Sequence, residues 1–337
     1  MKTKNYFLLP RGERNSIADI GDVEVGHVTI REGEHQTGVT VLLPHKENLF
    51  SKKLFAASHV MNGYGKSTGL SQMDELGYLE TPIAFTNTAS VGVIYDGLYQ
   101  YMSQNNEGIG RELGSVNPIV LECNDGKIND QRNPILDSSH FQKALEDAKK
   151  DFLQGDVGAG RGMICYNYKG GIGSASRKVE SHGISGTVGA LVLTNFGDSK
   201  NLRVLGTPAP SFGSKYHSED KGSIAVVIGT DLPLLPHQLK RVAKRAQSGI
   251  ARTGSYMGHG SGDLAVAFST AQTVLLEEKE IHAYEMVPDL IMDLIFLATV
   301  ESVEEAILQS MFRSSSGKTL KGEFVPSLAH YIANPLD

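Results

Sequence analysis

The sequence predicts an α+β fold built as one domain with largely antiparallel sheets. Predicted strands and helices alternate along all 337 residues, with no low-complexity linker and no break in composition. The predicted strands within residues 163–197, 224–228 and 264–269 follow one another closely, and the first of these segments has the pattern of a hairpin. Such neighbouring strands favour antiparallel pairing, whereas a doubly wound parallel sheet places a helix between successive strands.

Short runs of β-branched and apolar residues bounded by turn residues predict the strands. In chain order these strands fall within residues 17–30, 37–44, 81–85, 119–122, 163–168, 186–194, 224–228 and 264–269. Apolar residues spaced three and four apart predict the helices. The helices cover residues 68–76, 91–102, 138–153, 234–253 and 287–311. Residues 206–222 are rich in Pro, Ser, Gly and charge, and they predict a mobile or variable loop.

Composition and charge limit the class of protein. A net charge of −6 and 40% hydrophobic residues are typical of a globular protein, and the scattered basic residues predict no nucleic-acid partner. No apolar run reaches the length of a membrane-spanning helix, and the apolar stretch near the N-terminus is too short for a signal peptide. Two cysteines, Cys123 and Cys165, imply no disulfide framework. We therefore expect a cytoplasmic protein without a membrane partner.

The sequence predicts no metal and no other cofactor. The eleven histidines include no pair with the spacing of a metal-binding helix, and the two cysteines lie far apart. Residues 63–68, GYGKST, resemble the end of a phosphate-binding loop, but the first glycine of that motif is replaced by Val60.

A serine between two glycines marks the candidate active site. The segment RTGSYMGHGSGD, residues 252–263, places Ser261 directly after Gly260 and two residues before Asp263. A small hydroxyl nucleophile without bulky neighbours suits attack on an acyl carbon, including the chain's own Gly260 carbonyl. If that bond breaks, Ser261 gains an α-amine with a reference pKa of about 8, which can serve as a general base. Gly-Ser-Gly on its own is more often a turn.

Seven segments of the chain resemble, in the expected order, those of the L-aminopeptidase/D-esterase family, which includes the β-peptidyl aminopeptidases. They are residues 86–92, 169–177, 193–197, 233–239, 252–254, 258–263 and 267–270. The resemblance implies a four-layer αββα sandwich similar to N-terminal-nucleophile hydrolases with different connectivity. It implies self-cleavage between Gly260 and Ser261 into chains 1–260 and 261–337, which stay associated. It also implies a homo-oligomer, often a tetramer.

The resemblance assigns expected roles to individual residues. Ser261 is expected to be the nucleophile. Asn195 is expected to hold the oxyanion through its amide, with an Asx turn as the alternative. Tyr166 is expected to line the substrate pocket, although Tyr168 faces the same way in a strand. Asn87 lies in a matched segment and either binds substrate or only shapes its loop.

A hydroxyl and a carboxylate two positions apart are expected from residues 298–306. Thr299 with Glu301 has this spacing, and so does Ser302 with Glu304. Distance from the nucleophile favours Thr299 and Glu301, although the family usually carries serine at the first position. The alternative for each pair is a solvated glutamate face on a surface helix.

These observations predict an aminopeptidase or amidase-esterase. It would release N-terminal amino acids from short peptides, amides or esters through an acyl-enzyme on Ser261. An acyltransferase similar to ornithine acetyltransferase, which also cuts itself but uses a threonine, is the second hypothesis. A non-enzymatic binding protein that keeps the fold is the third. The sequence does not distinguish L-, D- and β-amino acid substrates.

Overall fold

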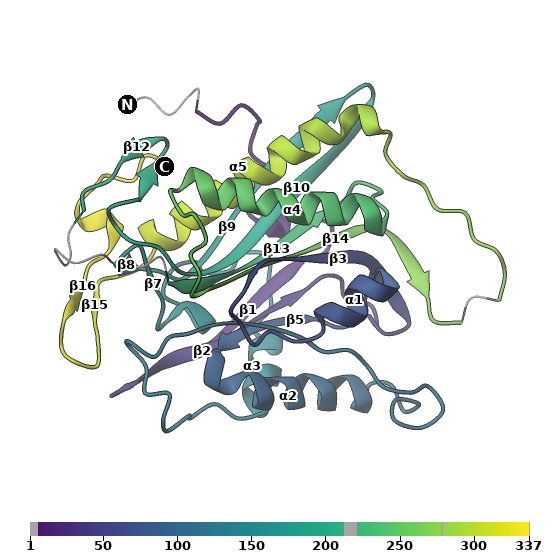
Figure 1. Cartoon of the computed structure of the whole chain (residues 1–337). Coiled ribbons are helices and arrows are strands. Elements are labelled where there is room, and N and C mark those ends of the chain that lie inside the picture. Colours follow the sequence, from purple (N-terminus) through teal and green to yellow (C-terminus); the bar gives the residue numbers. More distant parts are fainter. Residues whose placement is uncertain (1–5, 212–220, 278, 337) are drawn as a thin grey trace.

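The chain folds into four layers, which the computed structural model describes for residues 6–211, 221–277 and 279–336. A pair of helices, a four-stranded sheet, a six-stranded sheet and a second pair of helices follow one another from bottom to top in Figure 1. This arrangement confirms the α+β class and the αββα sandwich. None of the described helices combines the length and the apolar character needed to cross a membrane.

The two sheets are mostly antiparallel. The smaller has the order β1-β2-β5-β6, and the larger has the order β4-β3-β14-β13-β10-β9. Parallel pairing joins β5 to β6 and β13 to β14. The strands of the smaller sheet are β1 (Glu24–Glu32), β2 (His35–Leu43), β5 (Ile83–Asn87) and β6 (Ile119–Cys123). Those of the larger are β4 (Tyr78–Leu79), β3 (Lys52–Gly63), β14 (Ser261–Leu275), β13 (Gly222–Thr230), β10 (Ile184–Asn195) and β9 (Ile172–Ser181).

Helices cover the outer face of each sheet. α2 (Val91–Gln104) and α3 (Ser139–Glu146) pack on the smaller sheet, and α4 (Pro236–Arg252) and α5 (Met292–Phe312) pack on the larger one. The short α1 (Leu70–Leu76) packs near β3. Three pairs of short strands complete the described fold. They are β7 (Ile164–Cys165) with β8 (Tyr168–Lys169), β11 (Arg203–Val204) with β12 (Thr207–Pro208), and β15 (Gly317–Lys318) with β16 (Phe324–Val325).

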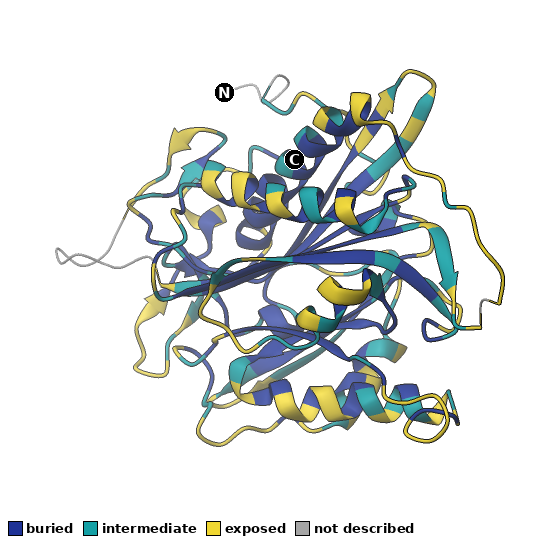
Figure 2. Ribbon diagram, turned by 45° about the vertical axis from the view of Figure 1, so that its right-hand side comes forward, coloured by how far each residue is buried: buried dark blue, intermediate teal, exposed yellow. Residues whose placement is uncertain are grey.

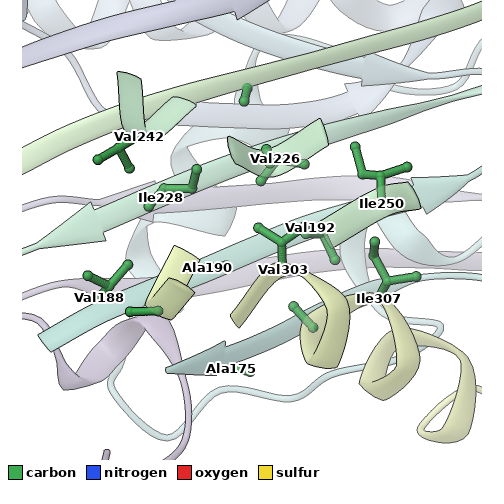
Figure 3. Packing of buried hydrophobic residues seen from close by; sticks show 14 of the residues in the cluster. Ala175, Val188, Ala190, Val192, Val226, Ile228, Val242, Ile250, Val303 and Ile307 are labelled. Carbon is green, nitrogen blue, oxygen red and sulfur yellow. The ribbon is translucent and has the colours of Figure 1, made fainter. Parts of the chain in front are cut away.

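Three buried apolar clusters hold the four layers together, and Figure 2 shows them as dark blue inner faces between exposed outer faces. Alternation along β10 explains how one strand serves two of them. Val188, Ala190 and Val192 meet α4 and α5 (Figure 3), whereas Leu191 and Leu193 belong to the cluster between the sheets. The central part of the larger sheet is therefore buried on both faces, and residues 188–193 of β10 and 224–228 of β13 are continuously apolar.

Strand β14 occupies the centre of the larger sheet. It pairs with β13 on one side and with β3 on the other. The predicted strand at residues 264–269 is thus confirmed, and it extends back to Ser261. Because both neighbours of β14 precede residue 261 in the chain, a break before Ser261 would leave β14 hydrogen-bonded on both edges.

The segment predicted as one strand at residues 163–168 is instead a tight hairpin. Tyr166 and Asn167 have φ angles of 53° and 64°, and they turn the chain between β7 and β8. A two-residue hairpin turn of this kind needs positive φ at both central positions. The glycine-rich residues 169–176 that follow supply the first half of β9.

Two further elements differ from the predictions. The helix predicted over residues 138–153 ends at Glu146, because Lys149 leaves the helical path to pair with Val25 of β1. Strand β3 was not predicted, since Ala56 and Ala57 have weak strand propensity and its pairing with β14 determines its conformation. Of the loop predicted at 206–222, residues 212–220 lie outside the described residues.

Candidate active site

The candidate nucleophile, Ser261, is the first residue of β14 and is 1% exposed. Its hydroxyl donates a hydrogen bond of 2.7 Å to Oδ1 of Asp263. Residues two apart in a strand face the same side of the sheet, so the extended backbone brings these two side chains together. The sequence places a carboxylate beside the hydroxyl, and the structure gives that carboxylate a direct contact.

A tight turn leads into Ser261. The Ser261 amide donates to the Gly258 carbonyl at 2.9 Å and closes the turn. The side-chain amide of Asn62, on β3, donates to the carbonyl oxygens of Gly258, at 3.1 Å, and of Ser261. The carbonyl oxygen of Gly260 accepts from the Gly222 amide at 3.4 Å. The carbonyl of the bond expected to break therefore faces a backbone donor.

A cavity of about 250 Å³ opens beside Gly260. Its walls come from both sheets and from the connections between them, and they are mostly polar or charged. The lining residues include Lys66, Thr88, Glu122, Asn195 and Gly222. A cavity of this size can accept a small aminoacyl group beside Gly260, the residue before the serine.

Glu122 places a carboxylate in this cavity. It lies on β6, is 4% exposed, and accepts hydrogen bonds from the Lys66 amide at 2.8 Å and from the Thr88 hydroxyl. A Cβ built on Gly65 would stand 3.4 Å from Oε1 of Glu122 and 3.9 Å from the Cα of Gly262. Gly65 thus lies between the Glu122 carboxylate and Gly262, the residue that follows Ser261.

Glu122 is not among the site residues predicted from the sequence. A signal was present, because this glutamate interrupts the otherwise apolar run of β6, and a buried charge is costly unless it is bound. The sequence does not show, however, that the end of β6 lies near the start of β14.

Asn195 lies at the end of β10 and lines the cavity. Its side-chain oxygen accepts from the Ile164 amide at 3.0 Å, and its side-chain nitrogen donates to the Asn124 carbonyl at 2.9 Å. The alternative of a local Asx turn is therefore not what its side chain does. An amide nitrogen carries two hydrogens, and the Asn124 carbonyl takes one of them.

Tyr166, the expected pocket residue, and Tyr168, its alternative, lie in the surrounding structure. Tyr166 is buried, and its hydroxyl hydrogen-bonds to that of Thr253 at 2.9 Å, at the end of α4. Burial raises the pKa of Tyr168 to about 12, and its hydroxyl donates to the Pro210 carbonyl at 2.6 Å. Neither tyrosine lines the cavity near Gly260.

Asn87 shapes its loop. Its side-chain oxygen accepts from the Ser90 amide at 3.1 Å and caps the chain at the start of α2, while its nitrogen donates to Thr37 at 2.7 Å. The cavity is lined by the next residue, Thr88. Of the two roles that the sequence left open for Asn87, the structure shows the one within the loop.

The structure does not place Thr299 and Glu301 beside the serine. Residues two apart on a helix point about 200° apart, so they do not share a face. The Thr299 hydroxyl bonds back to the Ile295 carbonyl at 2.8 Å. Glu301 binds Arg177 of β9 at 3.0 Å, and in the sheet register Arg177 lies level with residue 269 of β14. That level is roughly 25 Å from Ser261, at about 3.3 Å per residue.

The alternative pair has other partners as well. Ser302 donates to the Val188 carbonyl at 3.2 Å, at that same distant end of the sheet. Glu304 accepts from the Tyr6 hydroxyl and forms an ion pair with Arg252, both at 2.7 Å, and burial raises its pKa. The other alternative, a solvated glutamate face on a surface helix, is not observed, because the glutamates at 301, 304 and 305 are all buried.

These glutamates form an ion network beneath the N-terminal segment. Glu301 also accepts from the backbone amides of Leu8 and Leu9, at 2.7 and 3.2 Å. Glu305 binds Arg177 at 2.6 Å and Arg11 at 2.7 Å. The network attaches residues 6–15 to α5 and β9, which gives Glu301 a structural role.

Replacing Glu301 by Gln is therefore expected to weaken the fold and to spare the chemistry. Removing one partner of a buried ion pair costs about 3 kcal/mol, because the other charge is left in place. Thermal unfolding should show the loss, while turnover of an aminoacyl p-nitroanilide stays within about twofold of the parent chain. A hundredfold fall in turnover with an unchanged unfolding temperature would instead restore the catalytic role of Glu301.

Comparison with known proteins decides the family. A model described as Peptidase family S58 matches residues 15–325. The chain belongs to peptidase family S58. The family resemblance inferred from the seven segments is thereby confirmed, and the chain is a hydrolase of the aminopeptidase class. An acyltransferase is not favoured.

Relatives and solved structures agree with this assignment. The β-peptidyl aminopeptidase BapA of Sphingosinicella microcystinivorans is 36% identical over 348 residues, covering 95% of this chain and 86% of the relative. The PH0078 protein of Pyrococcus horikoshii OT3 is 44% identical with a TM-score of 0.90, over 97% of this chain and 96% of that one. The L-aminopeptidase D-Ala-esterase/amidase of Ochrobactrum anthropi is 35% identical with a TM-score of 0.87, over 95% and 93%. The last is described as a variant of the Ntn hydrolase fold.

Proposed function

We propose that this S58 peptidase cuts itself between Gly260 and Ser261 and then acts as an N-terminal serine aminopeptidase. The observation that carries the proposal is the position of Ser261. It begins the central strand, its hydroxyl is bound by a carboxylate, and the residue before it lines a cavity that holds a buried glutamate. After the cut, the serine hydroxyl and the new α-amine belong to the same residue, which in the intact chain directly follows the cavity-lining Gly260.

Each step of turnover then has a group at hand. The free α-amine of Ser261 accepts the hydroxyl proton as Oγ attacks the substrate acyl carbon. The Gly222 amide, which holds the Gly260 carbonyl in the intact chain, and the second hydrogen of the Asn195 amide stabilise the oxyanion. The leaving amine takes the proton, and water then releases the acyl group from Oγ.

Glu122 gives the site its preference for a free amino group. A substrate ammonium can bind this carboxylate, whose present partners are a backbone amide and a hydroxyl rather than a cation. With the substrate ammonium bound to Glu122, the scissile carbonyl of the substrate lies close to the nucleophile Ser261, which directly precedes Gly262. An amine held one residue from the reacting carbonyl makes the enzyme an exopeptidase.

The substrate class is a short peptide, aminoacyl amide or aminoacyl ester. The names of the relatives include β-peptides, L-amino acids and D-alanine esters, so L-, D- and β-aminoacyl substrates are the three classes to compare. A panel of L-, D- and β-aminoacyl p-nitroanilides, each with its N-acetylated counterpart, tests the proposal. Free-amine substrates should be hydrolysed and acetylated ones should not. Equal rates on blocked and free substrates would contradict the exopeptidase.

We also propose that the enzyme is cytoplasmic and forms a homotetramer. Both cysteines are buried free thiols, and burial together with the nearby Glu122 holds the pKa of Cys123 well above its usual range. Neither thiol depends on an oxidising compartment. The tetramer is supported by the family resemblance, and light scattering coupled to gel filtration gives the subunit number directly.

A further inference from the structure

We propose that Asp263 is the base for self-cleavage, with Gly222 as the oxyanion donor and Asn62 as a positioning residue. The inference rests on the self-cleavage proposed above and assigns its chemistry to this chain's own groups. It separates the first reaction of the protein, which happens once, from the peptidase reaction that follows.

The intact chain needs a base that the mature enzyme does not. Before the cut, the Ser261 nitrogen is an amide that donates to the Gly258 carbonyl, so it has no basic lone pair. The carboxylate of Asp263 accepts the Ser261 hydroxyl at 2.7 Å, which is the geometry of a base before proton transfer. Both residues are 1% exposed, so bulk water does not compete for the hydroxyl.

Gly222 supplies the donor for the developing oxyanion. Its amide already donates to the Gly260 carbonyl oxygen at 3.4 Å, and such contacts tighten in the transition state. Gly222 has a φ of 133°, and a Cβ there would lie 2.0 Å from the Asn195 carbonyl oxygen. The conformation that aims this amide at Gly260 therefore requires glycine.

Asn62 holds the turn on which the reaction occurs. Its side-chain nitrogen donates to the carbonyls on both sides of the scissile bond, those of Gly258 and Ser261. It leaves the Gly260 carbonyl to Gly222. Asn62 thus orients the turn without touching the carbonyl that is attacked.

The reaction is an acyl shift followed by hydrolysis. The bond between Ser261 Oγ and the Gly260 carbonyl carbon forms as the Gly260–Ser261 peptide bond breaks. The hydroxyl proton passes to Asp263 and then to the leaving nitrogen, which becomes the α-amine. Water then adds hydroxyl to the ester carbon and returns a proton to Oγ, leaving a Gly260 carboxylate and a free Ser261 hydroxyl.

The test follows the intact chain with time by mass spectrometry. Asp263→Asn keeps the shape and removes the base, and it should slow the appearance of chains 1–260 and 261–337 by about 100-fold or more. Asp263→Glu should recover part of the rate, and Asn62→Ala should slow it by about 10-fold. Asp289→Asn, which removes an exposed carboxylate that pairs with Arg241 of α4, is the matched control and should be cut like the parent chain.

Hydroxylamine tells which step Asp263 serves. It captures an ester at Gly260 as the hydroxamate, so it rescues a variant that forms the ester but hydrolyses it slowly. It should not rescue Asp263→Asn, because in that variant the slow step is the attack that forms the ester. Rescue would overturn the role of Asp263 as the base for attack. If Asp263→Asn does not fold, the same assay on Asp263→Glu decides between slow attack and slow hydrolysis.

The outcomes separate this inference from the proposed function. Cutting of Asp263→Asn at the parental rate would overturn the inference and leave the N-terminal serine mechanism standing. Failure of the parent chain to break before Ser261 would overturn the proposed function instead. A slow Asp263→Asn chain that hydroxylamine does not rescue, beside a rapidly cut control, is the result the inference requires.

Discussion

A chain carrying Ser261→Ala is expected to remain one polypeptide of 337 residues and to hydrolyse no aminoacyl substrate. The substitution removes both the group that would attack Gly260 and the group that would carry the acyl load. Removing the nucleophile of a serine hydrolase costs about 10⁶-fold in turnover. Denaturing gels and a p-nitroanilide assay measure the two effects on one preparation.

Ser255→Ala is the matched control for this substitution. Ser255 lies in the same loop, is also buried, and accepts from the Met257 amide at 3.0 Å, away from the Gly260 carbonyl. It should be cut and should stay active. An alanine chain at position 261 that still turns over substrate, or still yields two bands, would remove Ser261 from the mechanism.

Glu122→Gln is expected to give the second-largest effect. It should slow the peptidase reaction and leave self-cleavage almost unchanged. Loss of the carboxylate removes the charge that binds the substrate ammonium, and a buried charge pair of this kind is worth about 3 kcal/mol. The value of kcat/KM for free aminoacyl p-nitroanilides should therefore fall by roughly 100-fold. Self-cleavage involves no ammonium, so its rate should stay within about twofold of the parent chain.

The control for Glu122 is Glu112→Gln, an exposed glutamate outside the cavity, which should leave both rates unchanged. Glutamine keeps the shape. Its oxygen can still accept from the Lys66 amide and its nitrogen can donate to the Thr88 hydroxyl oxygen, so the fold should tolerate it. If kcat/KM is unchanged, Glu122 does not bind the amino group. If self-cleavage falls as far as peptidase activity, the residue supports the loop near Gly262 instead.

Local pattern predicted those parts of the fold that local chemistry decides. The buried strand after Ser261, the amphipathic helix at residues 234–253 and the strand ending at Asn195 all followed from apolar spacing and their end residues. Strand β3 was not predicted, because pairing with the strands on either side determines the conformation of its alanines. The tight hairpin at Tyr166 and Asn167 was not predicted, because bulky aromatic residues seldom have positive φ.

The candidate site was predictable only in its centre. Ser261 and its glycines are adjacent in sequence, so spacing alone could find them. Glu122 and Asn62 reach the site from β6 and β3, and only the stacking and pairing of strands brings them there. Thr299 and Glu301 were chosen for a linear spacing, whereas helix geometry and the position of α5 over β9 determine what they contact.

The most direct test of the whole account is the intact mass of the purified protein together with the N-terminal sequence of each component. The account predicts two chains in equal amounts, with the smaller one beginning at Ser261 and ending at Asp337. An unbroken polypeptide that hydrolyses aminoacyl substrates, or a smaller fragment that starts at any other residue, would contradict it.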